Sequence, residues 1–221
     1  MMNEDPEYYT HTRPEVAEIL PKELGKVLEI GCGEGRFAVH LKGADEHWGI
    51  EPVTDVAETA RESLSPVLVG IYDDVEEQLP DDYFDLVVCN DVIEHMPDHE
   101  WFFRSIRRKM KPGAVLVGST PNVRYLPNLV RVLWFKDWKY EDFGVLDRTH
   151  KRFFTEKSLK RSFVEAGFET ETLKGINSLA SVKNTLGQRF RAWIVFLIGP
   201  LSLGHSRDVQ FQQFGFRIRK P

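Results

Sequence analysis

The sequence predicts an α/β protein organised around one mostly parallel sheet. Short apolar runs of strand length alternate along the chain with stretches of helical period. Such alternation implies right-handed crossovers, which cover both faces of a sheet with helices. The first apolar run, residues 26–30, leads straight into a loop with three glycines. A chain of 221 residues that is 42% hydrophobic and 29% charged can bury a core, so we expect a single domain over residues 1–221.

The elements of the first half follow one another in regular order. Residues 1–25 are expected to form an N-terminal cap segment, in which Pro21 stops a short helix over residues 13–20. Asp98 is an expected helix N-cap, because its carboxylate can accept a hydrogen bond from a free backbone N–H group. Strands are expected at 26–30, 47–50, 67–71, 84–89 and 114–118, and helices at 36–41, 53–64 and 98–110.

The second half begins with a segment of a different kind. Residues 119–152 match neither the helical nor the strand period and are rich in aromatic side chains, so we expect an acceptor lid there. Thr155 is expected to cap a helix that runs to Ala166, and Gly167 to end it. Strands are expected at 168–176 and 209–219, with a helical insertion over residues 178–203 between them.

Charge and cysteine content exclude several classes of protein. The chain has 29 Lys and Arg against 34 Asp and Glu and lacks a basic stretch, so nucleic acid is not an expected partner. Cys32 and Cys89 lie in separate apolar runs, which favours a reducing, cytoplasmic compartment. Residues 1–10 lack the apolar core of a signal peptide. No group of Cys and His has metal-ligand spacing, so the sequence predicts no metal site.

The longest apolar run is residues 193–203, which Gly199 and Pro200 interrupt. A transmembrane helix requires about 20 residues, so this run is too short to span a bilayer. A helix of this kind commonly packs on its own domain or forms a dimer contact. Peripheral contact with a membrane surface is the alternative interpretation.

The most informative motif is EIGCGEG at residues 29–35, which follows the first expected strand. Glycine permits positive φ and allows a ligand to lie against bare backbone, next to the free N–H groups of a helix start. The third glycine comes one residue earlier than in the dinucleotide fingerprint, which disfavours NAD(P). A Walker loop is excluded because no Gly-Lys-Ser/Thr follows.

A carboxylate follows the second expected strand, at Glu51. It stands about twenty residues after the glycine loop, the distance at which an acidic side chain commonly binds a ribose in open α/β sheets. A carboxylate that faces the cleft suits hydrogen bonds to two ribose hydroxyls. The alternative for an acidic residue after a strand is a solvated turn.

Taken together, these motifs resemble the class I S-adenosylmethionine-dependent methyltransferases, whose Glu/Asp-x-Gly-x-Gly-x-Gly motif matches residues 29–35. The likeness covers nearly the whole chain: residues 84–95 are similar to the family's fourth strand and its following segment, and 110–114 to the turn before its fifth strand. The resemblance implies a Rossmann-like seven-stranded sheet, mostly parallel, with helices on both faces and an antiparallel last strand. It also implies a methyltransferase with S-adenosylmethionine as cofactor.

The resemblance places the cofactor at the glycine loop and at the ends of the neighbouring strands. The loop amides and Arg13 are expected to hold the methionine carboxylate, although Arg13 can equally be a surface residue. Asp91 is expected to hold the ammonium group, and Tyr9 to close the cleft. The implied cofactor-binding residues are Tyr9, Arg13, Glu29, Gly31, Cys32, Gly33, Gly35, Glu51, Pro52, Asp74, Val75, Asn90 and Asp91.

Residues 120–124 and 146–155 resemble a narrower group that modifies bacterial polysaccharides or related metabolites. This implies O-methylation of a sugar, a glycan or another small-molecule hydroxyl. A base-methylating enzyme usually has Asn/Asp-Pro-Pro-Tyr/Phe after the fourth strand, whereas residues 90–93 read NDVI. The alternative function is a cofactor-binding regulatory or scaffold subunit without turnover, which the intact glycine loop disfavours.

A hydroxyl acceptor benefits from a general base, which accelerates transfer by about 10²–10⁴-fold. His150 in the lid is the expected base, with Asp147 to orient it. His95, beside Glu94, is the alternative base, or else this pair supports the cofactor loop. The aromatic side chains of the lid either stack on the acceptor or anchor the lid to the sheet; they are Trp134, Phe135, Trp138, Tyr140 and Phe143.

Overall fold

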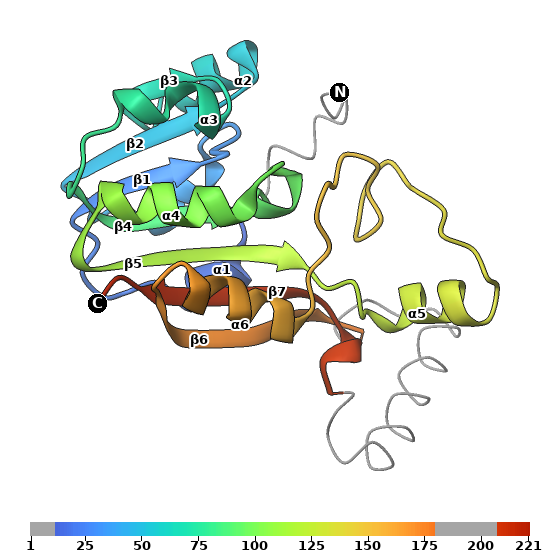
Figure 1. The fold of residues 1–221 in the computed structure, drawn as a ribbon. Coiled ribbons are helices and arrows are strands. Elements are labelled where there is room, and N and C mark those ends of the chain that lie inside the picture. The colour runs from blue at the N-terminus through green and yellow to red at the C-terminus, as the bar shows by residue number, and fades with distance from the viewer. Residues whose placement is uncertain (1–11, 180–206) are drawn as a thin grey trace.

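The computed structural model describes residues 12–179 and 207–221, whose strands form one seven-stranded sheet (Figure 1). The strand order is β3-β2-β1-β4-β5-β7-β6. Strands β1 to β5 pair in parallel, whereas β7 runs antiparallel to both β5 and β6. This confirms the predicted Rossmann-like sheet with an antiparallel last strand. The strands are β1 Lys26–Ile30, β2 Glu46–Glu51, β3 Val67–Val69, β4 Phe84–Asn90, β5 Met110–Pro121, β6 Glu169–Ser178 and β7 Phe211–Arg219.

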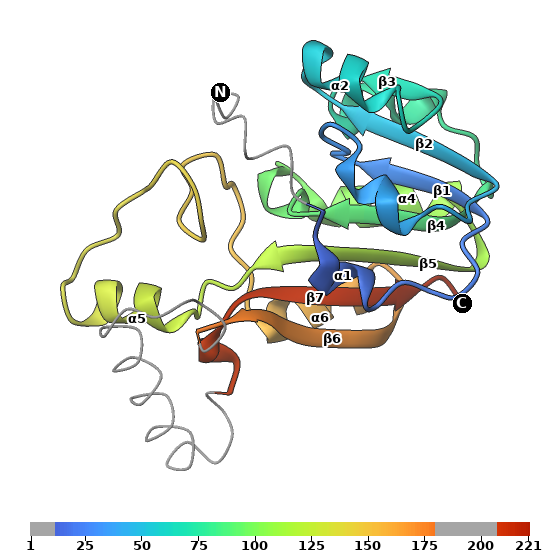
Figure 2. The same ribbon diagram turned by 180° about the vertical axis from the view of Figure 1, so that it is seen from behind.

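Helices cover both faces of this sheet. In Figure 1, α4 and α6 lie in front of the sheet, and Figure 2 shows α1 on the opposite face, against β5 and β7. The α-helices are α1 Pro14–Ala17, α2 Thr54–Ala60, α3 Tyr72–Val75, α4 His99–Lys109, α5 Leu126–Leu133 and α6 Glu156–Glu165. The short 3₁₀ helices among the described residues are η2 Arg36–His40, η3 Glu76–Gln78, η4 Ile93–His95 and η5 Arg207–Gln210.

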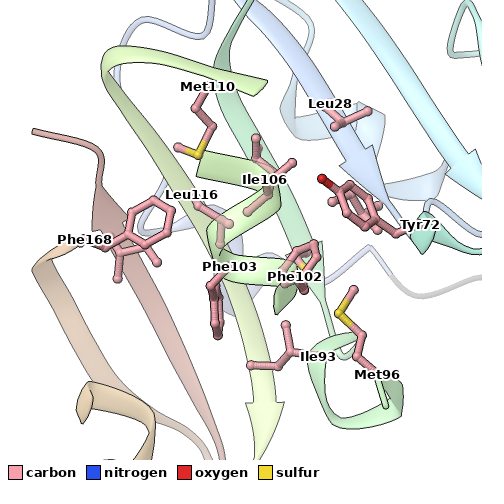
Figure 3. Close-up of a cluster of buried hydrophobic side chains, with 14 of the residues drawn as sticks. Leu28, Tyr72, Ile93, Met96, Phe102, Phe103, Ile106, Met110, Leu116 and Phe168 are labelled. Atoms are coloured by element: carbon pink, nitrogen blue, oxygen red, sulfur yellow. The ribbon is translucent and has the colours of Figure 1, made fainter. Parts of the chain in front are cut away.

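The strands are apolar on both sides because both faces of the sheet carry a core. Successive side chains of a strand point to opposite faces, so Val27 belongs to the core under α1 and Leu28 to the core under α4. Figure 3 shows Phe102, Phe103 and Ile106 of α4 packed beside Leu28 and other buried side chains of that larger core. These two packed faces fix the sheet edge at which the strands β1, β2 and β4 end.

Several helices are shorter than the sequence predicted. The helix predicted over 13–20 is regular only in α1, and the one predicted over 53–64 ends with α2. Leu64 still packs in the core with Ala57 and Ala60, but the chain turns away because the residue before Pro66 is restricted to extended backbone. The helix predicted over 36–41 is the 3₁₀ helix η2.

The lid prediction for residues 119–152 was wrong at its start. Strand β5 continues to Pro121 because β7 pairs with it as far as Gln213, and helix α5 follows. Residues 180–203 of the predicted helical insertion lie outside the described residues, as does the apolar run 193–203. Within the described parts of the chain, no helix has the length and apolar character needed to cross a membrane.

Helix α6 begins where the sequence predicted. The Ser158 N–H donates to Thr155 Oγ1 at 3.2 Å, and the Thr155 N–H donates to Ser158 Oγ at 3.0 Å. This reciprocal pair satisfies two backbone donors that the first helical turn leaves free. Gly167, with φ +81°, ends the helix as predicted.

Replacing this cap tests the assignment directly. We expect Thr155→Ala to lower the free energy of unfolding by about 1 kcal/mol, because the Ser158 N–H loses its acceptor. Urea denaturation measures the change. The exposed Thr170 on β6 provides the control, and Thr170→Ala should alter stability by less than about 0.5 kcal/mol. Equal stability of Thr155→Ala and the wild-type chain would contradict the capping role.

Candidate functional site

A cavity of about 320 Å³ lies where the parallel strands end. The residues that follow β1 and the last residue of β2 line it, as do Asn90 and Asp91 at the end of β4. The carboxyl ends of parallel strands meet at one edge of an open sheet, which is where such folds bind ligands. The structure therefore brings together, around one cavity, segments that are far apart in sequence.

The glycine loop forms one wall of this cavity. Gly31 and Gly33 have φ values of +67° and +54°, which disfavour other residues. A Cβ at Gly31 would lie 2.6 Å from Val92 Cγ2, so the loop also requires glycine for space. The Gly31 N–H donates to the Ile50 carbonyl at 2.8 Å, which ties the loop to β2. Bare backbone thus faces the cavity.

Glu51 lies at the same wall and holds the loop in place. One carboxylate oxygen accepts from the Gly33 N–H at 3.0 Å, and the other accepts from the Val53 N–H at 3.0 Å. The side chain is buried, and burial raises the pKa of this carboxyl, opposed by its two backbone hydrogen bonds. The carboxylate therefore has a fixed orientation at the cavity.

A second buried carboxylate, Glu29, lines the cavity at the end of β1. Its Oε2 lies 3.0 Å from Nε2 of His47 on β2. Burial raises the pKa of Glu29, and the contact with His47 opposes that shift. This pair joins neighbouring strands below the glycine loop.

Asp91 is the centre of a polar network at the end of β4. Its Oδ1 accepts from Ser119 Oγ of β5 at 2.7 Å and from Gln213 Nε2 of β7 at 2.8 Å. The carboxylate also forms an ion pair with Arg13, beside α1. The two residues that the sequence assigned to opposite charges of one ligand thus pair with each other at the cavity wall.

The far end of the cavity joins η4 to the segment before α6. The backbone N–H groups of Lys151 and Arg152 donate to the Glu94 carbonyl at 2.8 Å and 2.9 Å. Asp147, Thr149 and Lys151 line the cavity, so this part of the lid closes one side of it. The lid is held at this point by backbone hydrogen bonds.

Two histidines meet at this end. The rings of His95 and His150 lie 4.8 Å apart, edge to face. His95 lines the cavity, whereas His150 is absent from the lining and packs behind it. Burial lowers the pKa of both imidazoles, and the neighbouring His150 lowers that of His95 further. Both rings are therefore favoured in the neutral form.

Glu94 lies beneath this pair with only 1% of its surface exposed. Its Oε2 accepts from Thr120 Oγ1 at 3.1 Å, while Oε1 has no hydrogen-bond partner among the described residues. Burial and the Asp91 carboxylate raise the pKa of Glu94 well above its ordinary value. A buried oxygen without a partner is rare in folded proteins.

Nine of the thirteen predicted cofactor residues line this cavity. Gly35 is not in the lining, and a Cβ there would lie 2.6 Å from Leu64 Cδ1. Val75 is in the core and Asp74 is not in the lining; Ile71, Tyr72 and Asp73 form the wall after β3 instead. Tyr9 lies outside the described residues. The predicted residues that line the cavity are Arg13, Glu29, Gly31, Cys32, Gly33, Glu51, Pro52, Asn90 and Asp91, with Asp147 from the catalytic set.

Other lining residues were missed by the sequence analysis. Ile71 and Asp73 follow β3, so the rule that ligands bind beyond strand ends could have found them. Met96, Thr149 and Lys151 carry no such signal, because their place depends on how η4 and the lid pack. 

The lid aromatics do not all behave as anchors. Trp134, Phe135 and Phe143 are 82%, 70% and 72% exposed, so they do not attach the lid to the sheet. Trp138, by contrast, packs edge to face on Phe153, with 5.2 Å between the ring centroids.

Comparison with known proteins supports one family. A family model described as methyltransferase domain matches residues 3–173. The chain is 30% identical, over 165 residues, to the ubiquinone biosynthesis O-methyltransferase of Neisseria meningitidis serogroup A, a match that covers 68% of this chain and 66% of that protein. Against the human mitochondrial protein of the same name the identity is 28%, with 68% and 43% covered. The chain thus matches about two thirds of the bacterial relative and less than half of the human one.

Solved structures share the fold. An S-adenosylmethionine-dependent methyltransferase from Archaeoglobus fulgidus superposes with a TM-score of 0.66 at 20% identity, covering 95% of both chains. A methyltransferase from Thermotoga maritima, described as a possible histamine N-methyltransferase, gives 0.63 at 22% identity, covering 97% of this chain and 89% of the other.

The raised pKa of Glu51 leads to a pH dependence of stability. Below the ordinary value of 4.5 the carboxyl is protonated in the folded and unfolded chains alike. As the pH rises above 4.5, the unfolded chain loses its proton first, so the contribution of Glu51 to stability falls. We expect the free energy of unfolding of the wild-type chain, relative to Glu51→Gln, to decrease between pH 4.5 and 7 by at most about 1.4 kcal/mol per pH unit.

Urea denaturation of both chains across this range measures the difference. Glu58→Gln, a change on the exposed surface of α2, is the matched control and should show no comparable trend. If the difference in free energy of unfolding between the wild-type chain and Glu51→Gln stays constant with pH, burial does not shift the pKa of Glu51.

Proposed function

The chain belongs to the methyltransferase-domain family and has the class I fold that uses S-adenosylmethionine, and on this premise we propose that it methylates a hydroxyl oxygen of a small-molecule acceptor. The observation that carries the proposal is the cavity at the sheet edge, which has a glycine backbone and Glu51 at one end and neutral histidines at the other. The first end suits a nucleoside, and the second suits a group that must lose a proton.

The residues at the glycine end fit S-adenosylmethionine. Each oxygen of a carboxylate can accept about two hydrogen bonds, and the backbone supplies one to each oxygen of Glu51. The remaining capacity matches two ribose hydroxyls. Bare backbone at Gly31 leaves space for close approach of the ligand.

The Arg13–Asp91 pair fits the amino-acid end of the same cofactor. That end carries one ammonium and one carboxylate, and the pair presents the complementary charges at the cavity wall. Asp91 is oriented by Ser119 and Gln213, so its carboxylate is held in position whether or not Arg13 shifts.

When bound, S-adenosylmethionine supplies a methyl group on a positively charged sulfur: the acceptor oxygen bonds the methyl carbon, the carbon–sulfur electron pair stays with sulfur, and the hydroxyl proton leaves. The protein mainly orients the partners and excludes water. His95 faces the cavity and His150 packs against it, so we assign the loss of the proton to this pair together. The expected orienting residue Asp147 contacts Thr149, which in turn contacts His95.

A phenolic hydroxyl is the acceptor that this end favours. Its pKa is about 10, as in tyrosine, so a neutral imidazole promotes its ionisation more readily than that of an alcohol. The relatives named ubiquinone biosynthesis O-methyltransferases support transfer to oxygen. The sugar hydroxyl implied by the sequence is the second candidate. Cytoplasmic location, a second copy of the chain and contact with a membrane surface stay predictions.

Donor binding tests the glycine end. We expect Glu51→Ala to weaken binding of S-adenosylhomocysteine by about 10- to 150-fold, since hydrogen bonds to a charged group are worth about 1.5–3 kcal/mol. Isothermal titration calorimetry measures the affinity. The control Glu58→Ala, on the exposed side of α2, should bind like the wild-type chain. Unchanged affinity of Glu51→Ala would remove Glu51 from the site.

An acceptor panel tests the reaction. Purified protein with methyl-labelled S-adenosylmethionine should label a catechol or a phenol on oxygen, and the panel includes hexose glycosides as the second candidate. We expect His95→Ala to lower kcat by about 10²-fold or more while S-adenosylhomocysteine affinity stays within about threefold. Donor binding without transfer to any hydroxyl would favour the regulatory subunit instead.

A further inference from the structure

We propose that Glu94, His95 and His150 form a binding site for a divalent transition-metal ion at the acceptor end of the cavity. One carboxylate oxygen and one ring nitrogen of each histidine all lie within 4.8 Å of one another. Ligand atoms about 2.1 Å from one ion are roughly 3.4 Å apart in tetrahedral geometry. A contraction of at most about 1.4 Å between ligand atoms would therefore complete this side of a coordination sphere.

The unpartnered oxygen of Glu94 is the observation that first points to a cation. Glu94 is almost fully buried, yet its Oε1 has no hydrogen-bond partner in the described chain, while Thr120 satisfies Oε2. Leaving a buried acceptor unpaired costs about 1–3 kcal/mol, and more for a charged group. A cation held between this oxygen and the two imidazoles would supply both the missing partner and the missing charge.

One hydrogen bond determines which ring nitrogen of His150 carries the proton and which has a free lone pair. Its Nδ1 lies 3.1 Å from the Val145 carbonyl, which can only accept, so Nδ1 carries the proton. The neutral ring therefore has its lone pair on Nε2. Metal-binding histidines commonly donate their other ring N–H to a backbone carbonyl in this way.

A longer chain of contacts determines which ring nitrogen of His95 carries the proton. Its Nδ1 lies 3.2 Å from Thr149 Oγ1, and that hydroxyl donates its own proton to Asp147 Oδ1 at 2.6 Å. Thr149 must then accept from Nδ1, which leaves the lone pair of His95 on Nε2. Each histidine of the cluster therefore has one ring nitrogen with a free lone pair, and Glu94 has one oxygen without a partner in the described chain, with Thr149 and Asp147 as supporting residues.

Two imidazoles and a carboxylate favour Zn²⁺, Co²⁺, Mn²⁺ or Fe²⁺ over Mg²⁺ or Ca²⁺, which prefer oxygen ligands. Because His95 lines the cavity, an ion held here would keep coordination positions open towards the acceptor. Its role, which rests on the proposed function, is to lower the pKa of the acceptor hydroxyl. With the imidazole lone pairs bound to the ion, the hydroxyl proton passes to water and not to the histidines, and the oxygen keeps the electron pair with which it bonds the methyl carbon.

Metal binding can be measured without any methyl transfer. The untagged full chain is treated with a chelator, dialysed and titrated with Co²⁺, followed by visible absorption, and with Zn²⁺, followed by calorimetry. We expect one equivalent to bind, with Mg²⁺ at least tenfold weaker. Glu94→Gln and His150→Asn should each lower Co²⁺ affinity by at least tenfold. His40→Asn, a histidine outside the cluster, is the matched control and should bind Co²⁺ like the wild-type chain.

Each variant is also titrated with S-adenosylhomocysteine, which reports whether the cleft is folded. Should Glu94→Gln fail to fold, His150→Asn decides the question, because His150 lies in the lid and not in the core. The proposal is overturned if the wild-type chain binds no stoichiometric Co²⁺ or Zn²⁺, or if the variants bind it equally well. A chain that binds S-adenosylhomocysteine but no metal overturns this inference alone. A chain that binds metal but not S-adenosylhomocysteine overturns the proposed function alone.

Discussion

The hydrogen bond from the Gly33 N–H to the Glu51 carboxylate is the contact on which the cleft depends. It joins the loop after β1 to the end of β2, so the backbone wall and the acidic side chain beside it cannot shift independently. Parallel pairing of β1 with β2 brings the two within reach, since it aligns Ile30 with Ile50 and thus the residues that follow them. The sheet therefore determines the shape of the glycine end directly.

The acceptor end depends on a different kind of connection. Backbone N–H groups of Lys151 and Arg152 bond to the Glu94 carbonyl, so the lid is attached to η4 at the residue before His95. His150 is positioned by the same attachment and by its contact with Val145. Whereas strands build the glycine end, one loop docked on a 3₁₀ helix builds the acceptor end, and this is the part of the cleft in which related chains can differ without loss of the fold.

The sequence predicted what local chemistry determines. The bounds of β1 and the cap at Thr155 were correct, because an apolar run ending in glycine and a threonine before a helical period specify them locally. The end of β5 was missed, because polar residues 119–120 are in a strand only through pairing with the distant strands β4 and β7. The contact between His95 and His150 could not be predicted either, since no spacing links two residues that meet only when the lid docks.

Glu29 and Glu51 line the cavity and Glu94 lies next to the lining residue His95; all three carboxyls are buried, and burial raises the pKa of each. A core built for stability alone would avoid them, because a buried charge without full pairing costs several kcal/mol. Glu29 has a histidine and Glu51 two backbone donors, whereas one oxygen of Glu94 has no partner in the described chain. The carboxylate with an unpaired oxygen is thus the one at the acceptor end. A ligand or an ion that pairs with this oxygen recovers part of the free-energy cost of its burial. The buried carboxylates that lower the stability of the protein alone can therefore make binding favourable.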